Sequence, residues 1–144
     1  MAVTISLYNH TAAKFADGSF AVADTYKVTL YSAFSFDATD TTKTTAESGG
    51  TQLSTANGYT QDDKTLNNVT VSTVTTNDAK FDADDVSWTA SGGSITAIGA
   101  LVYNDTDTND PPVAYIDFGG SESAGDGTDF RIVWNANGII SFTA

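Results

Sequence analysis

The second half of the chain is a row of short segments in which apolar and polar residues alternate, each closed by Asp, Asn, Gly or Pro. Segments such as VSWTA, AYIDF and FRIVW have the two-residue period of a strand with one buried face. Turn-forming residues recur roughly every 8 to 12 residues, which is typical of antiparallel sandwiches and barrels. No helical pattern separates these segments, so a parallel α/β sheet is disfavoured. The pattern predicts a mainly β fold, a single antiparallel β-sandwich or barrel-like domain.

The length of the chain fits one domain. A chain of 144 residues buries about 68–70% of its unfolded surface, which is enough for a core without cross-links. We expect a single domain over residues 1–144, with an N-terminal helical segment at 1–18, a long surface loop at 37–57 and the main strand region at 58–144. The chain has no cysteine, which excludes disulfides and thiolate metal sites.

The N-terminal segment predicts one short helix at residues 7–16. Its apolar face, at helical spacing, carries Leu7, Tyr8, Ala12 and Phe15. Asp17-Gly18 supplies the stop, because glycine adopts positive φ without a Cβ penalty. A helix this short is not stable alone, so we expect its apolar face to dock on the sheet.

The alternating segments predict strands at residues 19–36, 66–74, 79–81, 86–90, 95–103, 113–118, 130–134 and 139–142. The segment at 95–103 is almost continuously apolar, which indicates a central strand covered on both faces. Gly119-Gly120 is expected to end the strand at residues 113–118. Asn137-Gly138 predicts a hairpin between the last two strands. Residues 37–57 lack a strand pattern and predict a surface loop with one helical turn near 44–48, a length typical of interaction surfaces.

The charge balance is strongly acidic. Eighteen Asp and Glu against six Lys and Arg give a formal net charge of -12. Such a surface repels phosphate backbones and anionic lipids, so we expect neither nucleic acid nor a membrane as partner. The surplus acid serves solubility, or it complements a basic patch on a partner protein. The segment MAVTISLYNH lacks the pattern of a signal peptide, and we expect none.

The residues needed for catalysis are scarce. His10 is the only histidine, and neither HExxH, GxSxG nor a phosphate-binding glycine loop occurs. We therefore predict no enzyme, no catalytic residue and no organic cofactor. His10 itself is expected at the surface or in an interface.

The acidic run at residues 105–110 resembles the opening of a calcium loop, with oxygen ligands at alternate positions. Asp105, Asp107 and Asn109 are the candidate ligands for a structural calcium ion. The sixth position is Asp110 rather than Gly and the twelfth is Ile116 rather than Glu, so the EF-hand pattern fails. The alternative is a solvated turn in which Asp side chains bond to the backbone.

Four aromatic residues within or beside the alternating strands suggest a carbohydrate-binding face, because sugars stack on exposed rings. They are Trp88, Tyr103, Tyr115 and Trp134. The alternative is that these rings lie in the core or in a protein interface.

Several stretches, spread over nearly the whole chain, resemble a family of small phage and prophage virion proteins. They include LYNHTAAKFADGSF, YKVTLYSAFSFDATDTT, KFDADDVSWTASGG, PPVAYIDFGG and FRIVWNANGIISF. The resemblance implies a structural protein of the virion, assembled in the bacterial host cytoplasm.

Within a virion, the resemblance implies a capsid decoration (cement) protein, commonly trimeric, bound to the major capsid protein. The alternatives are a tail or head-to-tail connector component. The net charge of -12 favours the capsid exterior over a DNA-filled interior. Contacts are expected from the N-terminal segment and the 37–57 loop, through the aromatic residues Tyr8, Phe15, Phe34 and Phe36.

Overall fold

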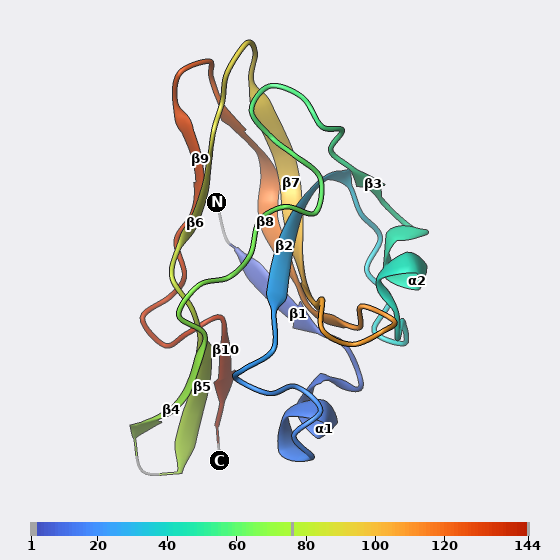
Figure 1. Ribbon diagram of the computed structural model, residues 1–144, viewed down its shortest axis with the longest axis vertical. Helices are drawn as coiled ribbons and strands as arrows, with labels where there is room; N and C mark the ends of the chain where they lie inside the picture. Colours follow the sequence, from blue (N-terminus) through green and yellow to red (C-terminus); the bar gives the residue numbers. More distant parts are fainter. Residues whose placement is uncertain (1–2, 76, 144) are drawn as a thin grey trace.

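The computed structural model describes residues 3–75 and 77–143, and over this range the chain is mainly β (Figure 1). The elements in chain order are β1 (Thr4–Leu7), α1 (Thr11–Ala16), β2 (Tyr26–Ala33), α2 (Lys43–Glu47), β3 (Thr51–Gln52), β4 (Thr70–Thr75), β5 (Asp78–Asp82), β6 (Val86–Thr89), β7 (Ile95–Asn104), β8 (Pro112–Ala124), β9 (Asp129–Ile132) and β10 (Ile140–Phe142). The predicted mainly β, antiparallel fold is confirmed. In the described part of the chain, no helix has the length and apolar character needed to cross a membrane.

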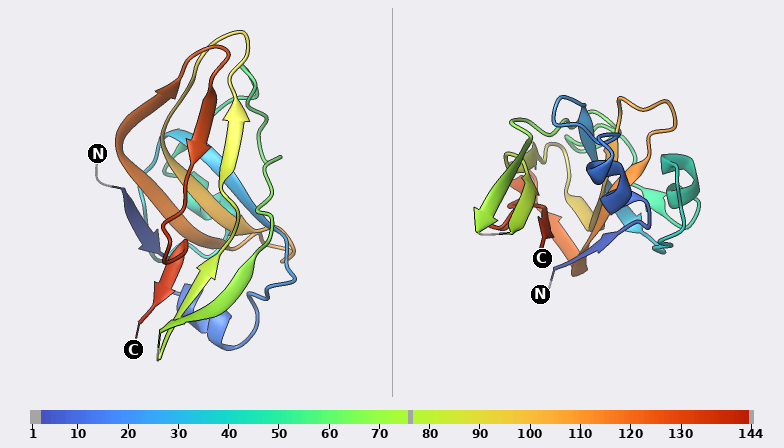
Figure 2. Two further views of the ribbon diagram at one scale, coloured as in Figure 1. Left: turned by 90° about the vertical axis from the view of Figure 1, so that its left-hand side faces the viewer. Right: turned by 90° about the horizontal axis from the view of Figure 1, so that it is seen from below.

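One five-stranded antiparallel sheet, in the order β1-β8-β7-β2-β3, forms the middle layer. β7 lies between β8 and β2, and its last six residues are all buried, which confirms the prediction of a central strand. The smaller sheets β10-β5-β4 and β6-β9 lie on one side of this sheet, and α2 lies on the other (Figures 1 and 2). The arrangement is sandwich-like.

The two smaller sheets follow one another along a single ribbon that is interrupted in the middle. β5 leads into β6 and β9 leads into β10, while β10 pairs with β5 and β9 pairs with β6. Three contacts bridge the interruption. Arg131 Nη2 lies 2.8 Å from Asp85 Oδ2, and Trp134 donates from its backbone N to Asp85 Oδ1 and from Nε1 to the Asp84 carbonyl.

The hairpin predicted around Asn137-Gly138 is wrong. Gly138 does adopt positive φ, at 89°, and its N–H donates to the Asn135 carbonyl, so the turn forms. The strands on either side of that turn, however, find partners in two different sheets. A local turn signal does not reveal that β9 pairs with β6 and β10 pairs with β5, instead of β9 and β10 pairing with each other.

The core fills the space between the five-stranded sheet and the two smaller ones. Tyr26, Leu30 and Val102 come from the first layer, and Phe81 and Trp88 come from the second. A second cluster lies on the opposite face of the sheet, under α2. It comprises Tyr8, Tyr31, Ala46, Leu101 and Tyr115, with Phe34 and Phe36 packed against it.

The N-terminal helix is shorter than predicted. Residues 4–7 form β1, which pairs with β8 from Thr4 opposite Asp117 to Leu7 opposite Ala114. Pairing with β8 gives the backbone groups of residues 4–7 hydrogen-bond partners. A short isolated helix would hold them less stably. α1 begins only at Thr11, whose hydroxyl donates to the Val113 carbonyl, and the predicted stop at Gly18 is present with φ of 82°.

β8 does not end at Gly119-Gly120 as predicted. Its pairing with β7 continues on the far side of the two glycines, to Ala124 opposite Ile95. Between the pairs Ala97–Glu122 and Gly99–Asp117, two steps along β7 match five along β8, so three extra residues bulge from β8. The glycines therefore form a bulge within the strand and do not end it.

The remaining differences concern element lengths. β2 begins at Tyr26 and not near residue 19, because the preceding residues form turns, including the Asp24 N–H to Ala21 carbonyl bond. The 37–57 segment contains the predicted helical turn as α2, and also the short strand β3. Thr42 caps α2, since its hydroxyl accepts the Thr45 N–H and the Thr45 hydroxyl accepts the Thr42 N–H.

The buried tyrosines predict an alkaline limit to stability. All six are at most 4% exposed, and burial is the main cause that raises each phenol pKa above its ordinary value of 10.0. Above this pH the unfolded chain loses phenolic protons that the folded chain keeps. Below pH 10.0 these groups therefore leave the free energy of unfolding unchanged. Above pH 10.0 each tyrosine lowers it by about 1.4 kcal/mol per pH unit, until the pH reaches the raised pKa of that tyrosine in the folded chain.

Urea unfolding at several pH values between about 9 and 11 measures this fall. Tyrosinate absorbance, followed in the same samples, should rise together with unfolding. Absorbance that rises near pH 10 while the chain stays folded would contradict the burial of these phenols.

Candidate interaction surface

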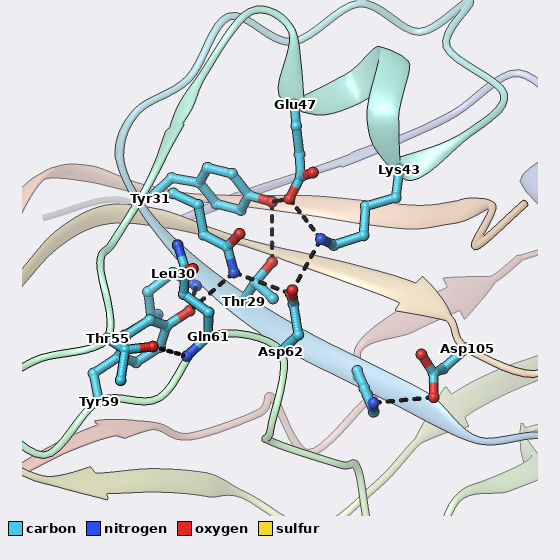
Figure 3. Close-up of polar contacts among 12 residues, drawn as sticks. Thr29, Leu30, Tyr31, Lys43, Glu47, Thr55, Tyr59, Gln61, Asp62 and Asp105 are labelled. Carbon is cyan, nitrogen blue, oxygen red and sulfur yellow. Dashed lines mark hydrogen bonds and ion pairs between the residues drawn. The ribbon is translucent and has the colours of Figure 1, made fainter.

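A polar cluster holds α2 and residues 55–62 against the five-stranded sheet (Figure 3). Lys43 Nζ lies 2.8 Å from Glu47 Oε1 and 3.1 Å from Asp62 Oδ1, and 5.2 Å from the centre of the Tyr103 ring. The buried Tyr31 hydroxyl donates to Glu47 Oε1 at 2.6 Å and accepts from the Thr29 hydroxyl. We call this group the Lys43 cluster.

The charges of the Lys43 cluster satisfy one another. Burial by itself lowers the pKa of Lys43, but hydrogen bonds to Glu47 and Asp62 outweigh it, so the pKa lies above its ordinary value. Burial, followed by the hydrogen bond to Glu47, raises the pKa of Tyr31. The cluster thus keeps an ammonium and a neutral phenol in fixed positions, which suits a structural clamp.

Removing the cation of the Lys43 cluster should destabilise the fold. Lys43→Met leaves Glu47 and Asp62 without their shared counter-charge. Because the Asp62 side chain is 42% exposed, we expect less than the cost of breaking a fully buried pair, about 2 kcal/mol in the free energy of unfolding. Asp62→Asn in the same background should recover part of this loss. Lys64→Met is the matched control. It removes a cation that lies over the Trp88 ring, 5.4 Å from the ring centre, and should lower the free energy of unfolding by less than about 1 kcal/mol. Equal losses at both lysines would contradict the clamp.

The predicted calcium ligands face lysines. Asp105 Oδ2 lies 3.0 Å from Lys27 Nζ, and Asp107 Oδ2 lies 3.7 Å from Lys14 Nζ. The other oxygen of Asp107 accepts the Asn109 N–H, as in the solvated-turn alternative. Within residues 3–75 and 77–143, no group of three or more Asp, Glu or His is arranged to hold a metal ion. The calcium hypothesis gains no support from this geometry.

The aromatic residues predicted to stack on sugars do not form a surface. Trp88, Tyr103 and Tyr115 are all buried, and Trp134 is half-buried with its indole N–H bonded to the Asp84 carbonyl. Three of the four rings therefore offer no face to a sugar. They belong to the core, as the alternative interpretation held.

The aromatic residues predicted as partner contacts pack mainly against this chain. Tyr8 is only 2% exposed, 4.9 Å from the Phe36 ring, and Phe34 stacks on Tyr115 at 4.0 Å. Phe15 lies 5.0 Å from Phe81. Tyr8 has no surface left for a partner, while Phe15, Phe34 and Phe36 are half-buried.

His10 has a structural partner. It precedes the first residue of α1, and its Nε2 lies 2.7 Å from the Pro112 carbonyl in a partly buried position. The contact ties the start of α1 to the start of β8. The histidine that the sequence placed at the surface or in an interface is thus engaged within the chain.

The edge strand β1 carries an exposed apolar row that sequence reasoning missed. Val3, Ile5 and Leu7 are 60%, 38% and 37% exposed and alternate with Thr4 and Ser6. The strand contains no charged residue and no proline. The alternation of apolar and polar residues in VTISL could have indicated this strand. Assigning residue 7 to the predicted helix at 7–16 hid the alternation.

A groove runs beside β1. One hollow of about 360 Å³ and another of about 400 Å³ lie beside β1, and Val3 contributes to the walls of both. The first is also lined by residues of β8 and β9, and the second by Ile5, Leu7 and residues 135–141 around the start of β10. We call this feature the β1 groove.

The origin of the β1 groove lies in the unequal lengths of β1 and β8. β1 pairs with β8 only from Ala114 to Asp117, whereas β7 pairs with β8 as far as Ala124. Phe118, Glu122 and Ala124, in the far half of β8, line the first hollow. The stretch of β8 beyond Asp117 has a paired strand only on the β7 side among the described residues.

The ionisable side chains in the β1 groove are acidic on balance. Glu122 and Asp129 line it together with Arg131, and Arg131 is already paired with Asp85. The groove thus combines an apolar floor with a negative rim.

A second apolar surface lies at the α1 end of the molecule. A hollow of about 440 Å³ is lined there by Phe15, Phe20, Val22, Val71 and Phe142, with some alanines. Val22 and Val71 are 48% and 45% exposed. Unlike the β1 groove, this surface includes a half-buried residue that the sequence predicted as a partner contact, Phe15.

Comparison with known proteins assigns no family: no family model matches the chain, and no curated protein or solved structure matches it.

Proposed function

We propose that this chain is a structural protein of a phage virion, a capsid decoration protein that binds the outer face of the assembled lattice. The exposed β1 edge carries this proposal. Proteins that work alone commonly guard edge strands with charges, proline or a bulge. β1 has neither a charge nor a proline over residues 3–7, although 17% of the chain is charged.

The sequence resemblance to small virion proteins supports the same proposal and names the partner, the major capsid protein. A trimer is the proposed form, since decoration proteins of this kind are commonly trimeric. Tail and connector positions remain the alternatives, and the edge strand serves any of these assemblies. A carbohydrate-binding module is less favoured, because three of its four candidate rings are buried.

The charge pattern supports a place on the capsid exterior. Five of the six basic side chains lie in ion pairs with Asp or Glu of the same chain, and the sixth, Lys64, lies over the Trp88 ring. Few cationic groups are left to contact phosphates, and the net charge is -12. Packaged DNA would repel such a surface.

The function requires no chemical step. A protein that binds only the assembled lattice stabilises it by RT ln(1 + [L]/Kd), roughly 2.7 kcal/mol per site when the free concentration is 100 times Kd. Repeated over many sites, this resists the pressure of the packaged genome.

The proposal is tested with capsid shells of the phage that encodes the chain. Shells assembled without the protein should lose heat resistance and regain it when the purified chain is added. Bound protein should be present in proportion to the capsid protein. Unchanged heat resistance would refute cementing, and only a few copies per particle would identify a connector or tail component instead.

A further inference from the structure

We propose that the β1 groove binds an extended segment of a different protein, which adds to β1 as a further strand and carries basic side chains. The inference deepens the proposed function, on which it rests for the origin of that protein. It specifies the chemistry of the contact: backbone pairing, apolar side chains in the groove and positive charge at its rim.

The backbone of β1 is the first reason. β1 is the last strand of the five-stranded sheet and is paired only with β8, from Thr4 to Leu7. Along its other side, β1 is paired with no strand of the described residues. An open strand edge of this kind presents unpaired N–H and C=O groups, and an added strand pairs with them. Figure 2 shows β1 at the rim of the sheet, outside the smaller sheets.

The side chains beside β1 are the second reason. Val3, Ile5 and Leu7 project toward the hollows they line, and Ile116 and Phe118 continue the apolar wall on β8. Successive residues of a strand point to opposite faces, so an added strand places every second side chain in the groove. The segment that fits is therefore one in which aliphatic residues alternate with polar ones.

Charge complementarity selects the occupant. Glu122 and Asp129 line the groove, and the cation beside them, Arg131, is already paired with Asp85. A segment with Lys or Arg at its polar positions gains attraction to this rim. A second copy of this chain would instead bring an uncharged β1 attached to a body of net charge -12. Two such bodies repel one another, which favours a basic partner over self-pairing.

The experiment measures binding of a labelled peptide to the full chain by fluorescence anisotropy. The probe is a peptide of about ten residues in which Val and Ile alternate with Lys and Thr. One control peptide replaces Lys with Glu, and another carries prolines that prevent strand pairing. We expect only the Lys peptide to bind measurably, and its affinity to fall by roughly tenfold as salt rises from about 50 to about 300 mM.

Variants of the chain locate the site. Ile5→Lys places a cation in the groove and should weaken binding of the Lys peptide by at least roughly tenfold. Val22→Lys is the matched control, because Val22 is an exposed aliphatic residue outside the β1 groove, at 48% against 38% for Ile5, and this variant should bind the peptide like the unaltered chain. Circular dichroism verifies that both variants are folded. A peptide that binds Ile5→Lys unchanged overturns the proposal.

The other outcomes are equally decisive. Failure of the Lys peptide to bind, or equal binding of the Glu or proline-containing peptide, overturns it. Self-association that strengthens as salt rises, and that Ile5→Lys abolishes, assigns the groove to a second copy instead. The two proposals can fail separately. If the peptide binds but the chain does not raise the heat resistance of the shells, only the decoration function is rejected. If the Ile5→Lys variant raises the heat resistance of the shells as much as the unaltered chain does, only the role of the β1 groove is rejected.

Discussion

The antiparallel pairing of β7 with β8 is the interaction on which the rest of the structure depends. These two strands form the middle of the five-stranded sheet, with β2 on one side and β1 on the other. The pairing requires Gly99, where a Cβ atom would overlap the Tyr115 hydroxyl and approach the Ile116 carbonyl. It also requires the bulge at Gly119-Gly120, because β8 carries three more residues than β7 between the two paired stretches.

The same pairing determines where the molecule is open. β8 is long enough to extend well past β1, so the sheet has a step at its edge, and the β1 groove lies at that step. The opposite face of the sheet is covered by α2 and the aromatic cluster beneath it, and the partly buried charges of the Lys43 cluster pair with one another. One face is thus covered within the chain by aromatic packing and paired charges, while the β1 edge keeps exposed aliphatic side chains.

The interface predicted from sequence and the one suggested by the structure differ for a physical reason. Aromatic residues in a loop and in an N-terminal segment are typical of partner contacts, which led to Tyr8, Phe15, Phe34 and Phe36. In the folded chain, the 33–50 segment crosses the face of the sheet, and Tyr8, Phe34 and Phe36 complete the cluster beneath it. A sheet face of this size needs cover, and large rings supply it within the chain. The less conspicuous valine, isoleucine and leucine of β1 stay exposed.

The sequence by itself determined the class of the fold, the existence of most strands, the central position of residues 95–103 and the glycine stop that follows α1 at Gly18. These features follow from alternation, burial on both faces and the backbone freedom of glycine, all of which act over a few residues. Only the tertiary structure decided that residues 4–7 form a strand, that β8 passes through Gly119-Gly120, and that the last two strands join different sheets. Strand partners are chosen by contacts between residues as distant as Thr4 and Asp117, and no local pattern records them.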